Sequence, residues 1–280
     1  MNNLHDIVSH FSIDGTVDVI EPMGAGLIND TYRVATVSSD TDDYVLQRIN
    51  HSIFKDVDLL QRNVVNVTEH IRKKLQERGE TDIKRKALRF IPAKDGKMYY
   101  FDGESYWRIS VLIPKSKTFE TVNPEFAYYT GKAFGDFQSM LVDIPQQLGE
   151  TIPKFHNMEF RLETFKESIK NNKAGRLEKA QGLVDELLVR ADEMCKAERL
   201  HREGILPKRI THCDTKVNNM LFDENGKVLC VIDLDTTMPG YVLSDFGDFI
   251  RTAGNTGAED DANLDNVNLN MDIFKSFAKG

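Results

Sequence analysis

The stretch from Thr211 to Asp235, THCDTKVNNMLFDENGKVLCVIDLD, constrains the fold more than any other part of this chain. It has the spacing H-x-D-x-x-x-x-N, in which Asp214 and Asn219 occupy the last two positions. A hairpin pattern follows, and its second strand ends at Asp233. Two carboxylates and a carboxamide staged in this way can surround a phosphate chain and its divalent metal ions. The stretch therefore predicts a site for phosphoryl transfer.

The residue types in this stretch suit separate tasks. Asp214 can accept the proton of an attacking hydroxyl, and Asn219 and Asp233 offer the hard oxygen atoms that Mg²⁺ prefers. Each residue alone is explained as well by a polar turn or a strand end, because Asp and Asn are common there. The ordered set is much rarer by chance, so the prediction depends on the set.

Composition limits the class of protein. The 280 residues are 40% hydrophobic and 29% charged, enough for one large domain or two smaller lobes. The net charge of −8 argues against a nucleic-acid-binding surface. Three cysteines without paired spacing predict reduced thiols. Since the sequence also has no signal-peptide pattern and no membrane-length apolar run, we expect a cytoplasmic protein that binds neither membrane nor nucleic acid.

The first part of the chain has mostly strand-like patterns. They occupy five segments: Val17–Ile20, Thr31–Val34, Tyr44–Ile49, Ala87–Ile91 and Tyr106–Ile113. One stretch with apolar residues at helical spacing, Asp56–Arg78, interrupts them. Residues 1–113 are therefore predicted to form an antiparallel sheet lobe with one inserted helix.

The character of the chain changes after Ile113-Pro114-Lys115-Ser116, which we predict as the lobe boundary. Helical patterns then dominate: Glu125–Val142, Glu159–Lys170, Arg176–Arg202 and Met271–Ala278. Residues 114–280 are predicted to form a mainly helical lobe that carries the catalytic and metal site. The predicted fold class is α+β.

The H-x-D-x-x-x-x-N motif and the following strand that ends in Asp resemble the aminoglycoside phosphotransferase and choline kinase superfamily. More narrowly, His212–Asn219 (HCDTKVNN) and Gly26–Tyr32 (GLINDTY) are similar to the N-acetylhexosamine 1-kinase branch. The resemblance extends from the glycine turn to Arg251. It implies a two-lobed protein-kinase-like fold, ATP and Mg²⁺ as cofactors, and phosphorylation of a small polar molecule. The implied acceptor is the C1 hydroxyl of an N-acetylhexosamine.

The resemblance also implies a role for each residue of the motif. Asp214 would be the catalytic base, Asn219 and Asp233 the metal ligands, and His212 a brace of the catalytic loop. Asp235 would add a contact to the metal site or cap a turn. Relatives in the narrower branch continue past the length of this chain, so we expect a C-terminal lobe shortened at its end.

A glycine-containing turn, Gly24-Ala25-Gly26, precedes the second predicted strand. Backbone amides can approach phosphate oxygens closely where side chains are absent, so Gly24 and Gly26 are candidates for nucleotide binding. A plain hairpin turn explains the same pattern. In the kinase-like order, the phosphates would lie under this turn and the adenine near the backbone of Leu112–Pro114.

Arg48 stands on the third predicted strand, where kinases carry a phosphate-binding lysine. Its guanidinium could bind phosphates in a bidentate fork, with Glu69 on the following helix as its partner. A shift of one residue exchanges the two faces of a strand, so Gln47 is the alternative for the nucleotide-facing position. Glu69 is equally well explained as a solvated charge.

Other functions fit part of the pattern. The acceptor could instead be an aminoglycoside, choline or another sugar. A metal-dependent phosphoesterase could use Asp214, Asp233, Asp235 and His212, although such sites require neither a glycine turn nor a basic strand residue. A non-catalytic nucleotide-binding module is less consistent with a complete set of base and metal ligands. The sequence leaves the oligomeric state open.

Overall fold

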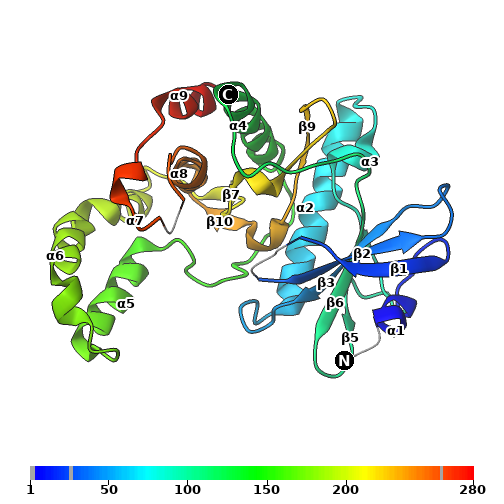
Figure 1. Ribbon diagram of the computed structural model, residues 1–280, viewed down its shortest axis with the longest axis horizontal. Coiled ribbons are helices and arrows are strands. Elements are labelled where there is room, and N and C mark those ends of the chain that lie inside the picture. Colours follow the sequence, from blue (N-terminus) through cyan, green and yellow to red (C-terminus); the bar gives the residue numbers. More distant parts are fainter. Residues whose placement is uncertain (1–3, 25–27, 259–260) are drawn as a thin grey trace.

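The computed structural model of the chain describes residues 4–24, 28–258 and 261–280. A sheet-rich part made of the earlier segments lies on one side of helix α2 (Val57–Glu77), and a mainly helical part lies on the other (Figure 1). The chain leaves the sheet after Val111, next to the predicted lobe boundary. This arrangement confirms the predicted α+β class.

The sheet is antiparallel, with strand order β1-β2-β3-β6-β4 and β5 paired to β6. Its strands are β1 (Val17–Pro22), β2 (Asp30–Thr36), β3 (Tyr44–Ile49), β4 (Phe90–Ile91), β5 (Tyr100–Phe101) and β6 (Tyr106–Val111). A short helix, α1 (Leu4–Ser9), packs on it and was not predicted. Six residues are too few to show a helical period.

Side chains alternate between the two faces of this sheet. Leu46 and Trp107 pack with α1 on what we call the outer face. Ile49 and Tyr106 pack against α2 on what we call the inner face. By the same alternation, Arg48 belongs to the outer face.

Helix α2 begins where the sequence predicted it. The carboxylate of Asp56 accepts a hydrogen bond from the backbone N–H of Leu59 at 2.8 Å, which caps the helix. The predicted span, 56–78, is confirmed to within a residue at each end. One flank of α2 contacts the helical part, since the side chain of Asn63 donates to the carbonyls of Gly149 and Thr237. Helix α2 therefore touches both parts of the molecule.

The helical part contains α4 (Pro124–Met140), α5 (Met158–Asn171), α6 (Leu177–Met194), α7 (Lys196–Arg202), α8 (Val242–Ala253) and α9 (Met271–Lys279). A four-residue helix, α3 (Ile83–Lys86), follows α2. The prediction of one helix over 176–202 was wrong. Cys195 ends α6 and precedes α7 with ψ of 2°, which departs from helical geometry and breaks the run.

Helix α9 packs closely against α4 and α8. The rings of Phe249 and Phe277 stack with their centroids 3.7 Å apart. At Gly131 in α4, an added Cβ would lie 2.3 Å from the carbonyl oxygen of Phe277, so the helices can approach this closely only at a glycine.

Two small antiparallel pairs hold the segment that carries the sequence motif. Strand β7 (Arg209–Thr211) pairs with β10 (Met238–Gly240), and β8 (Met220–Phe222) pairs with β9 (Val228–Val231). The loop between β7 and β8 and the turn after β9 therefore lie side by side. Across the described ranges, no helix has the length and apolar composition that crossing a bilayer requires.

Candidate active site

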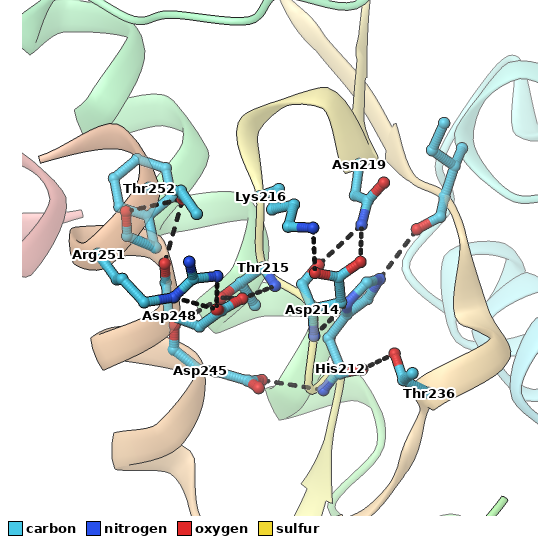
Figure 2. A network of polar contacts seen from close by, with 12 residues as sticks. His212, Asp214, Thr215, Lys216, Asn219, Thr236, Asp245, Asp248, Arg251 and Thr252 are labelled. Atoms are coloured by element: carbon cyan, nitrogen blue, oxygen red, sulfur yellow. Dashed lines mark hydrogen bonds and ion pairs between the residues drawn. The ribbon is translucent and has the colours of Figure 1, made fainter. Parts of the chain in front are cut away.

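The loop after β7 brings Asp214 and Asn219 together. The side-chain nitrogen of Asn219 donates to the backbone carbonyl of Asp214 at 2.8 Å and to its carboxylate at 3.0 Å (Figure 2). The ammonium of Lys216 lies 3.4 Å from the other carboxylate oxygen. Asp214 remains partly exposed to solvent, with 26% of its side chain accessible. Its carboxylate is thus oriented by two neighbours and still open to a reactant.

Asp245, at the start of α8, holds this loop from behind. Its buried carboxylate accepts hydrogen bonds from the backbone N–H groups of His212 and Cys213, at 2.9 and 2.8 Å, and from the amide of Gln138 at 2.6 Å. Cys213 has a φ of +64°, a costly conformation for a residue with a Cβ. The two bonds to Asp245 stabilise that conformation.

His212 is fully buried beneath the loop. Its Nδ1 accepts the backbone N–H of Asp214 at 3.2 Å, so the ring proton lies on Nε2, which donates to the carbonyl of Ile232 at 2.9 Å. The rings of Phe134 and Phe137 contact it edge-on. The histidine links the loop to the end of β9.

A second carboxylate of α8, Asp248, also reaches the loop. It accepts the backbone N–H of Thr215 at 2.8 Å and pairs with Arg251 at 2.8 Å (Figure 2). The hydroxyl of Thr215 donates to the carbonyl of Asp245 at 2.6 Å. Both carboxylates of α8 are therefore engaged in holding the loop.

Asp233 follows β9 and lies next to Asn219, because the backbone N–H of Ile232 donates to the carbonyl of Asn219 at 2.9 Å. Its φ and ψ of 56° and 61° are left-handed. Asp233 is exposed as a residue, but protein atoms surround its carboxylate and reduce its solvation. This crowding, and the nearby charge of Asp235, raise the pKa of Asp233 to about 6.

The residues present fit a magnesium ion. The amide nitrogen of Asn219 is used by Asp214, and its side-chain oxygen points away from that contact (Figure 2). Together with the carboxylate of Asp233, it supplies two hard oxygen donors. Within the described ranges, no group of three or more His, Cys, Asp or Glu side chains is arranged to hold a metal. Two protein ligands suit Mg²⁺ that is completed by phosphate and water oxygens.

Asp235 has partners that the sequence did not indicate. Arg108 of β6 donates to both its carboxylate oxygens, at 2.5 and 2.9 Å, and both side chains are less than 5% exposed. Asn29 adds a hydrogen bond at 2.8 Å. Asp235 is thus neither a free metal ligand nor a simple turn cap. One signal pointed to Arg108: a lone arginine in the apolar strand sequence YWRISVLI requires a buried partner.

Arg48 and Gln47, the two candidates for the nucleotide-facing position, lie on opposite faces of the sheet. Arg48 lies on the outer face of the sheet, half exposed, and pairs with Asp30 of the neighbouring strand. Gln47 lies on the inner face, where its side-chain oxygen accepts from Arg108 at 3.0 Å. The physical reason is the two-residue period of the strand, which places Arg48 with the buried Leu46.

The remaining predicted residues are less informative. Glu69 is exposed on α2, and among the described residues the partner of Arg48 is Asp30 and not Glu69. Gly24 has a φ of +72°, which favours glycine at this turn. Gly26 lies outside the described residues.

Two residues near Asp214 were not predicted from the sequence. Lys216 stands two positions after Asp214, and that short spacing was a usable signal. The second residue is His156. Its ring nitrogen Nδ1 is buried without a hydrogen-bond partner among the described residues, and burial lowers its pKa despite the nearby charges of Asp248 and Asp245.

A cavity of about 910 Å³ lies elsewhere, between α2, α4 and the β8–β9 hairpin. Its lining includes Leu234 but neither Asp214 nor Asn219. The polar contacts, and not this cavity, therefore identify the candidate site.

The sequence profile of the phosphotransferase enzyme family matches residues 19–271 of the chain. Several solved structures are similar to it. One is an amicoumacin kinase in complex with AMP-PNP and Ca²⁺, at 13% identity and a TM-score of 0.62, covering 99% of this chain and 75% of that chain. An aminoglycoside phosphotransferase from Alicyclobacillus acidocaldarius is 16% identical, with a TM-score of 0.52, and the match covers 86% of this chain and 68% of that chain. An ethanolamine kinase from Plasmodium vivax is 15% identical, with a TM-score of 0.53, and the match covers 94% of this chain and 68% of that chain. At these identities the similarity shows the fold, and it confirms the predicted kinase-like, two-lobed arrangement.

Proposed function

Because the chain belongs to the phosphotransferase enzyme family, we propose that it transfers the terminal phosphoryl group of ATP to a hydroxyl of an N-acetylhexosamine, at C1. Family membership makes the chain a phosphotransferase. The sugar acceptor is part of the proposal, and it derives from the resemblance of the catalytic loop and the glycine turn. ATP as donor is supported by the AMP-PNP bound in the similar amicoumacin kinase.

The observation that carries the proposal is the pairing of Asp214 with Asn219 and Lys216. Asp214 would orient the acceptor hydroxyl and take its proton as the new P–O bond forms. The bond between the terminal phosphorus and the bridging oxygen breaks, and its electron pair leaves with ADP. Lys216 is placed to offset negative charge on the transferred group.

Asn219 and Asp233 would hold Mg²⁺, which when bound neutralises charge on the phosphate oxygens. The side chain of Asn219 cannot rotate freely, because its nitrogen is held by Asp214. Its remaining oxygen is therefore fixed in direction before a metal arrives. In this proposal the nucleotide lies between residues 1–113 and 114–280, with its phosphates at the turn that includes Gly24 and Gly26.

A metal-dependent phosphoesterase is the weaker alternative. It would need His212 and Asp235 as additional metal ligands. Both ring nitrogens of His212 are hydrogen-bonded to the backbone, and Asp235 is bound by Arg108.

The three cysteines are buried and unpaired, which supports the proposal of a reducing, cytoplasmic location.

A coupled ADP-release assay with Mg²⁺ and ATP tests the function. The acceptor panel should contain N-acetylglucosamine, N-acetylgalactosamine, glucose, galactose, choline and kanamycin. We expect ADP only with the N-acetylated sugars. ADP release with choline or kanamycin alone would show that the acceptor is not an N-acetylhexosamine. Phosphate release from a simple ester, without ADP formation, would show that the protein is a phosphoesterase and not a kinase.

A further inference from the structure

We infer that Arg108 and Asn29 are positioning residues that fix the loop of Asp233 against the sheet and the residues just before β2, with Asp235 as the shared contact. The inference rests on the proposed phosphotransferase function. It assigns to these residues no contact with the reacting atoms; they act through Asp235.

The contact between Arg108 and Asp235 has a defined geometry. The two terminal nitrogens of Arg108 reach one carboxylate oxygen each, at 2.5 and 2.9 Å. Such a fork fixes the plane of the carboxylate as well as its position. The remaining guanidinium nitrogen, Nε, donates to Gln47 at 3.0 Å, which orients Arg108 in turn. The carboxylate is therefore held in a single orientation relative to the sheet.

Asn29 connects this pair to the start of strand β2. It stands between Gly24 and strand β2, and it is 9% exposed. Its side-chain nitrogen donates to Asp235 at 2.8 Å, and its side-chain oxygen accepts the backbone N–H of Asn50 at 2.9 Å. One side chain thus links the segment just before β2 to both Asn50 and Asp235.

On the other side, Asp235 is rigidly linked to the metal and catalytic loops. It lies in one 3₁₀ turn, Leu234–Thr236, that directly follows Asp233. Its carbonyl accepts the hydroxyl of Thr151 at 2.7 Å, and the hydroxyl of Thr236 donates to the carbonyl of His212 at 2.8 Å. A displacement of Asp235 would therefore move both Asp233 and the catalytic loop.

Stability alone is a poor reason for such a pair. Among ion pairs of the described residues, this one has both side chains less than 5% exposed. Removing two charges from water is costly, and an apolar pair of similar volume often stabilises a protein as well or better. The directional fork instead gives a fixed distance between two loops that must hold the same phosphate chain.

The test compares Asn29→Ala, Arg108→Met, Asp235→Asn and the double variant Arg108→Met/Asp235→Asn. Arg33→Met is the matched control, because Arg33 of β2 forms a partly exposed ion pair with Asp43. Thermal unfolding identifies variants that fail to fold. ADP release with the best acceptor then gives kcat and the KM for Mg-ATP.

We expect Arg108→Met and Asp235→Asn each to lower kcat/KM for Mg-ATP about 100-fold, the loss typical of a displaced active-site group. The double variant should have about the same kcat/KM for Mg-ATP as either single variant, because each single substitution already removes the Arg108–Asp235 contact. Asn29→Ala should stay folded and lose about 10-fold through KM. Arg33→Met should match the parent chain.

Three results would overturn the inference: parental kinetics for folded Asn29→Ala, losses that multiply in the double variant, or a raised KM in Arg108→Met with parental kinetics in Asp235→Asn. The last would mean that Arg108 binds phosphate directly. Amide hydrogen exchange separates this inference from the proposed function, since it requires no turnover. Faster exchange in both Asp30–Thr36 and Ile232–Thr237 of Asn29→Ala would support the coupling even if no acceptor yields ADP, and unchanged exchange would refute it.

Discussion

The catalytic loop and the inner face of the sheet are held by different kinds of contact. In the loop, the carboxylate of Asp245 accepts two backbone N–H groups, so it fixes the course of the main chain. On the inner face, Arg108 and Asp235 hold one another by side chains alone. The hydrogen bonds from the loop backbone to Asp245 remain when side chains of the loop are substituted. The Arg108–Asp235 pair, in contrast, is lost when either residue is substituted. We therefore expect the loop to set the chemical step and the sheet to set nucleotide affinity.

The largest effect is expected for Asp214→Asn. The substitution keeps the shape of the side chain but removes the proton acceptor, so kcat should fall at least about 1,000-fold. Affinity for AMP-PNP with Mg²⁺, measured by calorimetry, should be unchanged. Asp192→Asn, on the exposed face of α6, is the matched control. Retained turnover in Asp214→Asn would remove Asp214 from the role of base.

Asp245→Asn tests the loop itself. The new amide can accept one of the two backbone N–H groups but presents a donor to the other, which leaves a buried mismatch. Urea unfolding should show a loss of about 3 kcal/mol, the cost of breaking hydrogen bonds to a buried charge. In folded protein, kcat should fall more than the KM for ATP changes. The reverse pattern would break the proposed division between loop and sheet.

Gly131→Ala separates the expected losses of kcat in Asp214→Asn and Asp245→Asn from a general loss of stability. The added methyl group would collide with the carbonyl of Phe277, and helices α4 and α9 would have to move apart. We expect a loss of about 2 kcal/mol, typical of overpacking, with kcat and KM unchanged at a temperature where the protein is folded. Gly135→Ala in the same helix meets open space and should be neutral or stabilising. Equal effects from the two substitutions would contradict the close packing.

The elevated pKa of Asp233 predicts a pH dependence with a definite sign. Its folded-state pKa of about 6 exceeds the ordinary value of 3.8, so the folded chain binds the extra proton more tightly than the unfolded chain. This contribution to stability is present below pH 3.8 and is lost as pH rises through about 6. The melting temperature of metal-free protein should therefore fall less between pH 5 and 7 in Asp233→Asn than in the parent chain. Equal slopes would show that Asp233 does not titrate in this range.

The two regions also differ in how far the sequence predicts them. Asp214 and Asn219 are five positions apart, so a short loop between two strands forces them together. Helix α2 was predicted from its apolar period, and the structure adds the cap at Asp56. Arg108 and Asp235 are 127 positions apart, and no local pattern specifies their contact. The break at Cys195 was missed because it depends on a single ψ angle within a continuous helical pattern.

Arg48→Met compares the outer face of the sheet with the inner face, where Arg108 lies. Of the substitutions considered, it should have the smallest effect. Sequence order alone placed Arg48 at the kinase lysine position, whereas the strand period places it on the outer face with Asp30. An exposed pair of this kind contributes at most about 1 kcal/mol, because water solvates both partners. Urea unfolding and the KM for Mg-ATP should therefore remain close to the parental values. A large rise in KM for Arg48→Met, with Arg108→Met unaffected, would mean that the outer face binds the nucleotide, and the assignment of the two faces would have to be exchanged.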